Sequence, residues 1–226
     1  MSVVLIIQST DVIMALIKRL RGKVVVVGKN AVEQVILDAA LEVLVEKSIS
    51  GTRMHLIAEK AGMAQSNLHY YYKTKHDLLV ALYQSIHKRF EEDRKRVRRK
   101  NYEDIDSRLQ VFFDQKKDII LNQSATDFAR IDYWSQGRSD PEFKEMFYEA
   151  NQVWYQEIQN AIHQFAPNVS QEHCGMISRI MISMMNGASV QYLNHPGLMD
   201  LDEYFGLCKA MLLAQIEEFE KMDPKA

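Results

Sequence analysis

The chain has an almost unbroken helical periodicity, which leaves few fold classes open to it. Nine glycines and four prolines are spread over 226 residues, and long stretches contain neither. A protein made of many short strands needs more turn residues than this. Between residues 32 and 44 the apolar residues recur at alternating spacings of three and one, which places them on one face of an α-helix. The sequence therefore predicts an all-α protein.

Cap signals and breakers predict where the helices begin and end. Asn30 with Glu33, and Thr74 with Asp77, have the spacing of capping boxes, in which each residue's side chain bonds to the other's backbone N–H. Helices are predicted to begin after both Asn30 and Thr74. The other predicted helices cover about residues 54–61, 64–72, 104–122, 125–136, 141–165, 170–194 and 201–221.

Charge divides the chain into two unlike halves. Residues 1–100 carry 18 Lys and Arg against 10 Asp and Glu, a net charge of +8, whereas residues 101–226 carry 10 against 20, a net charge of −10. A basic half next to an acidic half favours a polyanion as the partner of the first half alone. We expect an N-terminal extension of unknown role at 1–29, a small domain at 30–76 and a larger helical domain at 77–226.

Several classes of protein are disfavoured by motifs that the sequence lacks. Cys174 and Cys208 are too few for a disulfide framework, which fits a reducing cytoplasm. Polar residues interrupt each apolar run of the N-terminal extension, so we expect no membrane span, and an amphipathic helix on a membrane surface stays the alternative for that segment. We find no catalytic motif and no metal-ligand spacing, and we expect neither catalysis, nor a cofactor, nor a metal.

Residues 52–72 have the layout of a helix-turn-helix. A short helix with a buried face is followed by a tight turn at Ala61-Gly62-Met63 and by a second helix with exposed polar residues. Glycine suits the sharp turn, and Gln and Asn side chains can bond adenine in the major groove through two hydrogen bonds. Tyrosine hydroxyls and the Lys75 ammonium suit phosphates. The layout therefore predicts an interface for double-stranded DNA.

The segment TRMHLIAEKAGMAQSNLHYYYKTKHDLL resembles the DNA-binding segment of the TetR family of bacterial repressors. The resemblance covers about residues 31–82, and it departs from the family pattern at Met63, Ala64, His69, Tyr72 and Lys73. It implies a three-helix DNA-binding domain followed by a helical domain for ligand binding and dimerisation. It implies contacts to base edges from His55, Gln65, Ser66, Asn67 and His69, and contacts to phosphates from Thr52, Arg53, Tyr70, Tyr71 and Lys75.

In the acidic half, aromatic and Met side chains on apolar faces are expected to form both core and ligand pocket. The predicted pocket residues are Phe112, Phe113, Tyr133, Trp134, Asn151, Trp154, Met181, Met185 and Asn186, with Asp132 and Gln191 as further polar anchors. The apolar stripes on the last two helices have two interpretations. They pack in the chain's own core, or they form a four-helix bundle with a second copy, which is what the resemblance implies. The predicted dimer residues are Ile177, Ile180, Met184, Phe205, Cys208, Leu212 and Ile216.

The sequence thus predicts a cytoplasmic, homodimeric repressor that binds a pseudo-palindromic operator and is released by a small-molecule effector. An alternative is a helical ligand-binding or scaffolding protein whose N-terminal domain does not read DNA. An activator on the same fold is a second alternative, because position relative to a promoter decides the sign of regulation.

Overall fold

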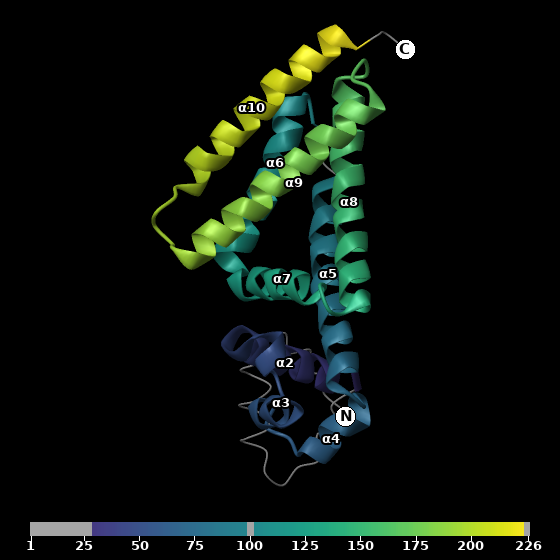
Figure 1. The fold of residues 1–226 in the computed structure, drawn as a ribbon, viewed down its shortest axis with the longest axis vertical. Coiled ribbons are helices and arrows are strands. Elements are labelled where there is room, and N and C mark those ends of the chain that lie inside the picture. The colour runs from purple at the N-terminus through teal and green to yellow at the C-terminus, as the bar shows by residue number, and fades with distance from the viewer. Residues whose placement is uncertain (1–28, 99–101, 224–226) are drawn as a thin grey trace, which may run out of the picture.

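The computed structural model describes residues 29–98 and 102–223. The predicted extension at 1–29 lies outside the described residues except for Lys29. The described residues form helices and no strand, so the all-α prediction is confirmed. A small group of helices lies at one end of an elongated molecule, a long helix leads away from it, and the remaining helices form the larger part (Figure 1). The bounds are α2 Lys29–Gly51, α3 Met54–Lys60, α4 Gln65–Tyr71, α5 Lys75–Arg98, α6 Ile105–Asn122, α7 Ser124–Gln136, α8 Pro141–Phe165, α9 Gln171–Asn194 and α10 Leu201–Met222.

The small group has the geometry of a helix-turn-helix. Helix α2 carries a kink at Ser48, whose φ of 59° is in the left-handed region, and the chain then turns into α3. Between α3 and α4, Gly62 has a φ of 65°, which a residue with a Cβ adopts only at a cost. The prediction that Gly62 allows the sharp turn between the two helices is therefore confirmed.

Two capping predictions have different outcomes. Thr74 and Asp77 bond reciprocally, each backbone N–H lying 3.0 Å from the other side chain, which confirms the capping box at the start of α5. The prediction that Asn30 caps the first helix was wrong, because α2 already includes Lys29, and Lys29 rather than Asn30 pairs with Glu33, at 3.8 Å. Glu33 therefore forms an ion pair with Lys29, four residues earlier in the same helix, instead of a capping bond to Asn30.

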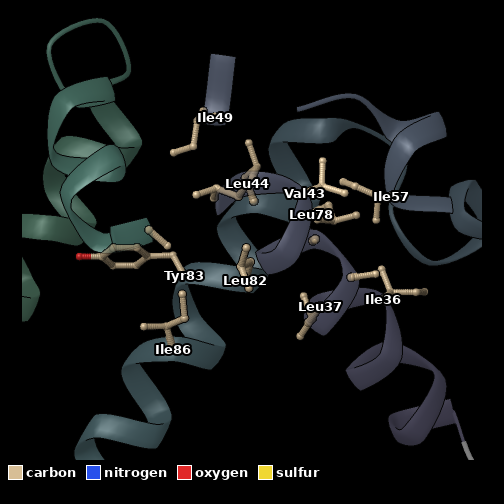
Figure 2. Packing of buried hydrophobic residues seen from close by; sticks show 14 of the residues in the cluster. Ile36, Leu37, Val43, Leu44, Ile49, Ile57, Leu78, Leu82, Tyr83 and Ile86 are labelled. Carbon is tan, nitrogen blue, oxygen red and sulfur yellow. The ribbon is translucent and has the colours of Figure 1, made fainter. Parts of the chain in front are cut away.

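The first of two hydrophobic clusters joins the small group to the larger part. Its centre lies between α2, α3 and α5, where Ile36, Leu44, Ile57 and Leu78 are fully buried (Figure 2). The same cluster extends to Tyr133 on α7, so the small group and α7 share one core. Helix α7 therefore packs directly against the small group.

The second cluster lies between α6, α8, α9 and α10. It includes Leu109, Ile158, Ile177 and Leu212, all of which are buried. Helices α9 and α10 lie side by side, and the Tyr204 hydroxyl donates to the Met184 carbonyl at 3.3 Å. None of the helices in the described part of the chain is both long and apolar enough to cross a membrane.

Candidate DNA interface and ligand cavity

Helix α4 presents polar side chains to solvent at the end of the molecule farthest from α9 and α10 (Figure 1). Leu68 is fully buried and anchors the helix, whereas Gln65, Ser66 and Asn67 are exposed at its first turn. Ala64 is the N-cap and makes no side-chain cap bond, as expected for a residue without a hydroxyl. The amide groups of Gln65 and Asn67 are therefore available to base edges.

His69 and the tyrosines have more varied surroundings. The ring of His69 is half-buried, its Nδ1 lies 3.1 Å from the Lys73 carbonyl oxygen, and its Nε2 lies 3.4 Å from the Gln65 amide nitrogen. Both ring nitrogens thus have partners inside or beside α4. Tyr70 is 73% exposed and packs edge-on against half-buried Tyr71. Tyr70 is consequently the more accessible of the two hydroxyls for a phosphate.

The structure corrects the role expected for Thr52. Its side chain is fully buried, and its hydroxyl donates to the Ser48 carbonyl at 2.7 Å, which closes the turn before α3 and leaves no group for a phosphate. Arg53 is exposed and donates to the carbonyls of Ser50 and Thr52, while His55 is exposed on α3.

Lys75 lies at the start of α5 and is half-buried. Its ammonium donates to the Ile49 carbonyl at 3.0 Å, and burial, followed by the charge of Arg53, lowers its pKa. An ammonium has three donors, so a phosphate can still be bound beside Ile49.

A cavity of about 40 Å³ lies among α5, α6, α7, α8 and α9. It is lined by Tyr83, His87, Phe90, Lys116, Ile119, Arg130, Phe147, Ala150, Asn151, Trp154, Ile182, Met185 and Asn186. Of the residues predicted for a pocket, Asn151, Trp154, Met185 and Asn186 line this cavity, and Trp134 lines a neighbouring groove. The structure corrects the prediction for Phe112, Phe113, Tyr133 and Met181, which are buried in the two cores and do not line the cavity. Gln191 is exposed and Asp132 faces the helix-turn-helix.

The sequence pattern does not reveal the cluster of charged residues at the cavity, which is formed by Lys116, Asp127 and Arg130. Asp127 has a fully buried side chain, and its Oδ1 accepts from Lys116 Nζ at 2.8 Å and from Arg130 Nε at 3.1 Å. Burial, and next the charge of Arg130, lowers the pKa of Lys116 to about 7. Burial alone would raise the pKa of Asp127, but the two cations hold it below its ordinary value. Asp127 and Arg130 are three residues apart on one helix, a spacing that favours an ion pair. Nothing in the sequence indicates that Lys116, on another helix, lies next to them.

Helix α7 connects this cavity to the helix-turn-helix. Arg130 lines the cavity, and two residues farther along Asp132 accepts a hydrogen bond from the Ile49 backbone N–H at 2.5 Å. The adjacent Tyr133 is buried and donates its hydroxyl to the Leu79 carbonyl at 2.7 Å. These bonds hold α2 and α5 against α7. Arg130 at the cavity therefore lies within one helical turn of the two residues that bond α7 to α2 and α5.

Helices α9 and α10 also correct the predicted dimer surface. Ile177, Phe205, Cys208, Leu212 and Ile216 are buried against the chain's own helices, whereas Met184 is half-buried and Ile180 is 40% exposed. An apolar stripe shows that a helix face is buried without showing against what. The apolar side chains that the two helices leave exposed include Met176, Ile180, Leu207 and Met211, which we call the outer apolar face.

The segment that contains the helix-turn-helix matches one family model and is similar to part of a curated protein. The model of a family described as "Bacterial regulatory proteins, tetR family" matches residues 36–82. The HTH-type transcriptional regulator RutR of Escherichia coli (strain K12) is 37% identical over 71 residues, which are 29% of this chain and 34% of RutR. The chain thus matches about a third of the length of that curated relative.

The fold as a whole is similar to that of several solved structures. A transcriptional regulator from Pseudomonas aeruginosa PAO1 has a TM-score of 0.77 at 13% identity, covering 88% of this chain and 97% of that one. One from Saccharomonospora viridis, in complex with choline, has a TM-score of 0.70 at 18% identity, covering 84% and 97%. FadR from Bacillus subtilis, in complex with stearoyl-CoA, has a TM-score of 0.66 at 15% identity, covering 80% and 97%. Because these sequence identities are below 25%, the structural similarity establishes the fold alone.

Proposed function

We propose that this chain is a member of the tetR family of bacterial regulatory proteins, whose model matches its residues 36–82, and that it is a homodimeric transcriptional repressor released from DNA by a small-molecule effector. Residues 30–76 are the DNA-binding domain in this proposal, and residues 77–226 bind the effector and the second copy. The observation that carries it is the joint presence of an exposed α4 and a cavity whose lining helix α7 is bonded to α2 and α5.

The DNA contacts are proposed from exposure and chemistry. Gln65, Ser66 and Asn67 contact base edges from the first turn of α4, with His69 and His55 at the margins. Tyr70, Tyr71, Arg53 and Lys75 contact phosphates, and Thr52 stays in its structural role. A dimer places two such helices in successive major grooves, which requires a pseudo-palindromic site.

The second copy is proposed to cover the outer apolar face. Met176 and Ile180 lie one turn apart on α9, and Leu207 and Met211 lie one turn apart on α10, so each helix offers a stripe. Two copies related by a two-fold axis would bury these stripes in a four-helix bundle. This replaces the residues that the sequence had suggested, because most of those are already buried.

Effector release is proposed to work through α7. A ligand that binds better when α7 is displaced would shift the population away from the DNA-competent arrangement of α2 and α5. A coupling free energy of about 1–3 kcal/mol changes operator affinity by roughly 5- to 150-fold, and DNA must weaken ligand binding by the same factor. Stearoyl-CoA in FadR and choline in the Saccharomonospora regulator support binding of a small molecule by this fold.

The proposal is tested by selecting bound duplexes from a random pool with the purified full chain, followed by affinity measurements over a salt series. We expect enrichment of an inverted repeat together with a salt-dependent affinity. A scaffolding protein with a basic surface would show the salt dependence without any enriched sequence. An activator would enrich the same repeat, so a reporter assay with the repeat at its natural promoter is needed to separate it from a repressor.

Single substitutions separate reading of bases from binding of phosphates. We expect Gln65→Ala and Asn67→Ala to cost about 1–3 kcal/mol on the selected operator and little on random DNA, because only the operator offers the matched base edge. Lys75→Gln should weaken both DNAs alike and reduce the salt slope, since an ammonium binds phosphate at any sequence. The checks are fluorescence anisotropy titrations of each variant, with thermal unfolding to confirm its fold.

Lys221→Gln is the matched control for the loss of one positive charge, because Lys221 is exposed near the end of α10, and that end of α10 lies at the opposite end of the molecule from α4 (Figure 1). It should leave both affinities unchanged. Equal losses on operator and random DNA for the Gln65, Asn67 and Lys75 variants would show that this assignment of roles is incorrect.

A further inference from the structure

The cavity adjoins two grooves in the larger helical part of the molecule. It shares Tyr83, His87 and Ala150 with a groove of about 540 Å³ on one side. It shares Arg130, Phe147 and Asn186 with a groove of about 280 Å³ on the other side. Because they share lining residues, the cavity lies next to both grooves. Arg130 lies where the cavity meets the smaller groove. The cavity of about 40 Å³ is small, and the grooves that border it offer the larger volumes.

The two grooves differ in charge. The larger groove is lined by Glu91, Glu149 and Glu157 against Lys88, so its rim is acidic. The smaller groove is mostly apolar, with Ile131, Trp134, Phe147 and Val190 in its lining, and Arg130 is its charged residue. An anion is therefore repelled from the larger groove and attracted through the smaller one.

The charges buried at the cavity are unequal. Lys116 and Arg130 both pair with Asp127, so two potential cations face one carboxylate at a site where the side chains of Lys116 and Asp127 are almost inaccessible to water. His87 of α5 also lines the cavity, while Glu157 of α8 lines the larger groove. When Lys116 is protonated, this cluster carries one positive charge more than Asp127 balances, and a buried charge is costly unless an anion balances it. An anionic ligand would therefore gain more here than a neutral one.

Arg130 also has the geometry to receive such an anion. The bond to Asp127 uses its Nε, and a guanidinium has four further N–H donors on its two terminal nitrogens. Its carbon lies 6.0 Å from the centroid of the Phe147 ring, and both residues line the cavity and the smaller groove. A carboxylate is planar and matches two guanidinium donors.

We propose that the cavity binds a small apolar molecule with one carboxylate, which pairs with Arg130 and Lys116 while the apolar part lies in the groove beside Trp134. The inference rests on the proposed function only where it makes this molecule the effector. Binding also favours protonated Lys116, whose pKa in the empty cavity lies near 7, so the complex takes up protons above that pH.

The test compares three straight-chain molecules of about eight carbon atoms on the full-length protein: octanoate, octan-1-ol and octylammonium. The two tryptophans, Trp134 and Trp154, line the groove and the cavity, so quenching of their fluorescence reports occupancy alongside calorimetry. We expect octanoate to bind about tenfold or more tightly than octan-1-ol and octylammonium not to bind saturably. Equal or tighter binding of either other molecule overturns the proposal.

Variants locate the anion. Arg130→Gln should weaken octanoate about tenfold while changing octan-1-ol little, and Arg130→Lys should recover part of the loss. Arg138→Gln, an exposed arginine just beyond α7, is the matched control. Where circular dichroism shows that Arg130→Gln is unfolded, Trp134→Asp replaces it, because this exposed position adds a negative charge to the groove. Unchanged octanoate affinity in the variant that folds overturns the assignment.

Proton uptake gives an independent readout. Calorimetry of octanoate binding in two buffers of different ionisation enthalpy, at about pH 7.5, should show uptake of up to about one proton, lost in Lys116→Met. Octanoate is titrated without DNA first and then against the operator complex. Binding without operator release would contradict the effector role and leave the site intact, whereas absence of any selected operator would contradict the DNA proposal alone.

Discussion

Asp127→Asn is expected to destabilise the folded protein by about 3–5 kcal/mol, because it removes the carboxylate that pairs with two buried cations. The Asp127 side chain is fully buried, and both Lys116 and Arg130 bond to its Oδ1. The neutral amide keeps the size but leaves the charge of Arg130, and that of Lys116 where it is protonated, without a counter-ion. Urea unfolding followed by circular dichroism measures the loss, and a change below about 1 kcal/mol would contradict the importance given to this ion cluster.

Lys116→Met is the matched comparison within the same cluster. It leaves Asp127 paired one-to-one with Arg130, so we expect the free energy of unfolding to stay within about 1 kcal/mol of the native protein near neutral pH. Similar losses for the two variants would show that packing, and not charge balance, determines stability here.

The pH dependence of stability follows from the same groups. The folded-state pKa of Lys116, about 7, lies below its unfolded value of 10.5, so the unfolded chain binds more protons between these values and this contribution to stability rises with pH. The rise should disappear in Lys116→Met. The pKa of Asp127 is lowered from 3.8, so its contribution is present above that value and is lost as the pH falls through the folded-state pKa.

Leu207→Glu is expected to convert the protein to a monomer and to weaken operator binding by roughly 10²–10⁴-fold, because the two recognition helices then no longer bind as one unit. Leu207 is 63% exposed on the outer apolar face, so a charge there costs little in the isolated chain but is buried in the proposed dimer. Sedimentation velocity gives the oligomeric state, and titration of the selected operator gives the affinity.

Met211→Glu, one turn farther along α10, should give the same result. Leu121→Glu is the matched control, because Leu121 is 45% exposed at the end of α6 and does not belong to the outer apolar face. It should remain dimeric and bind the operator as the native protein does. If Leu207→Glu and Met211→Glu are still dimers, the two copies meet elsewhere.

Local features of the fold could be predicted because they depend on residues close in the chain. The helices at 141–165 and 201–221 match α8 and α10 to within one residue, since their caps and breakers are local. Thr74 and Asp77 form the expected capping box for the same reason. Asn30 failed as a cap because the helix continues through Lys29, and boundaries without a strong breaker shift by a residue or two.

The candidate sites contain features that depend on residues close in the chain and features that depend on packing between distant segments. Amino-acid order determined the helices, the glycine turn and the exposed amides of α4, because each follows from contacts within a few residues. Tertiary structure decided that Thr52 is buried, that Lys116 meets Asp127, and which face of α10 is left for a second copy. Helical periodicity shows that a face is apolar, but its partner is chosen by packing between segments far apart in the chain.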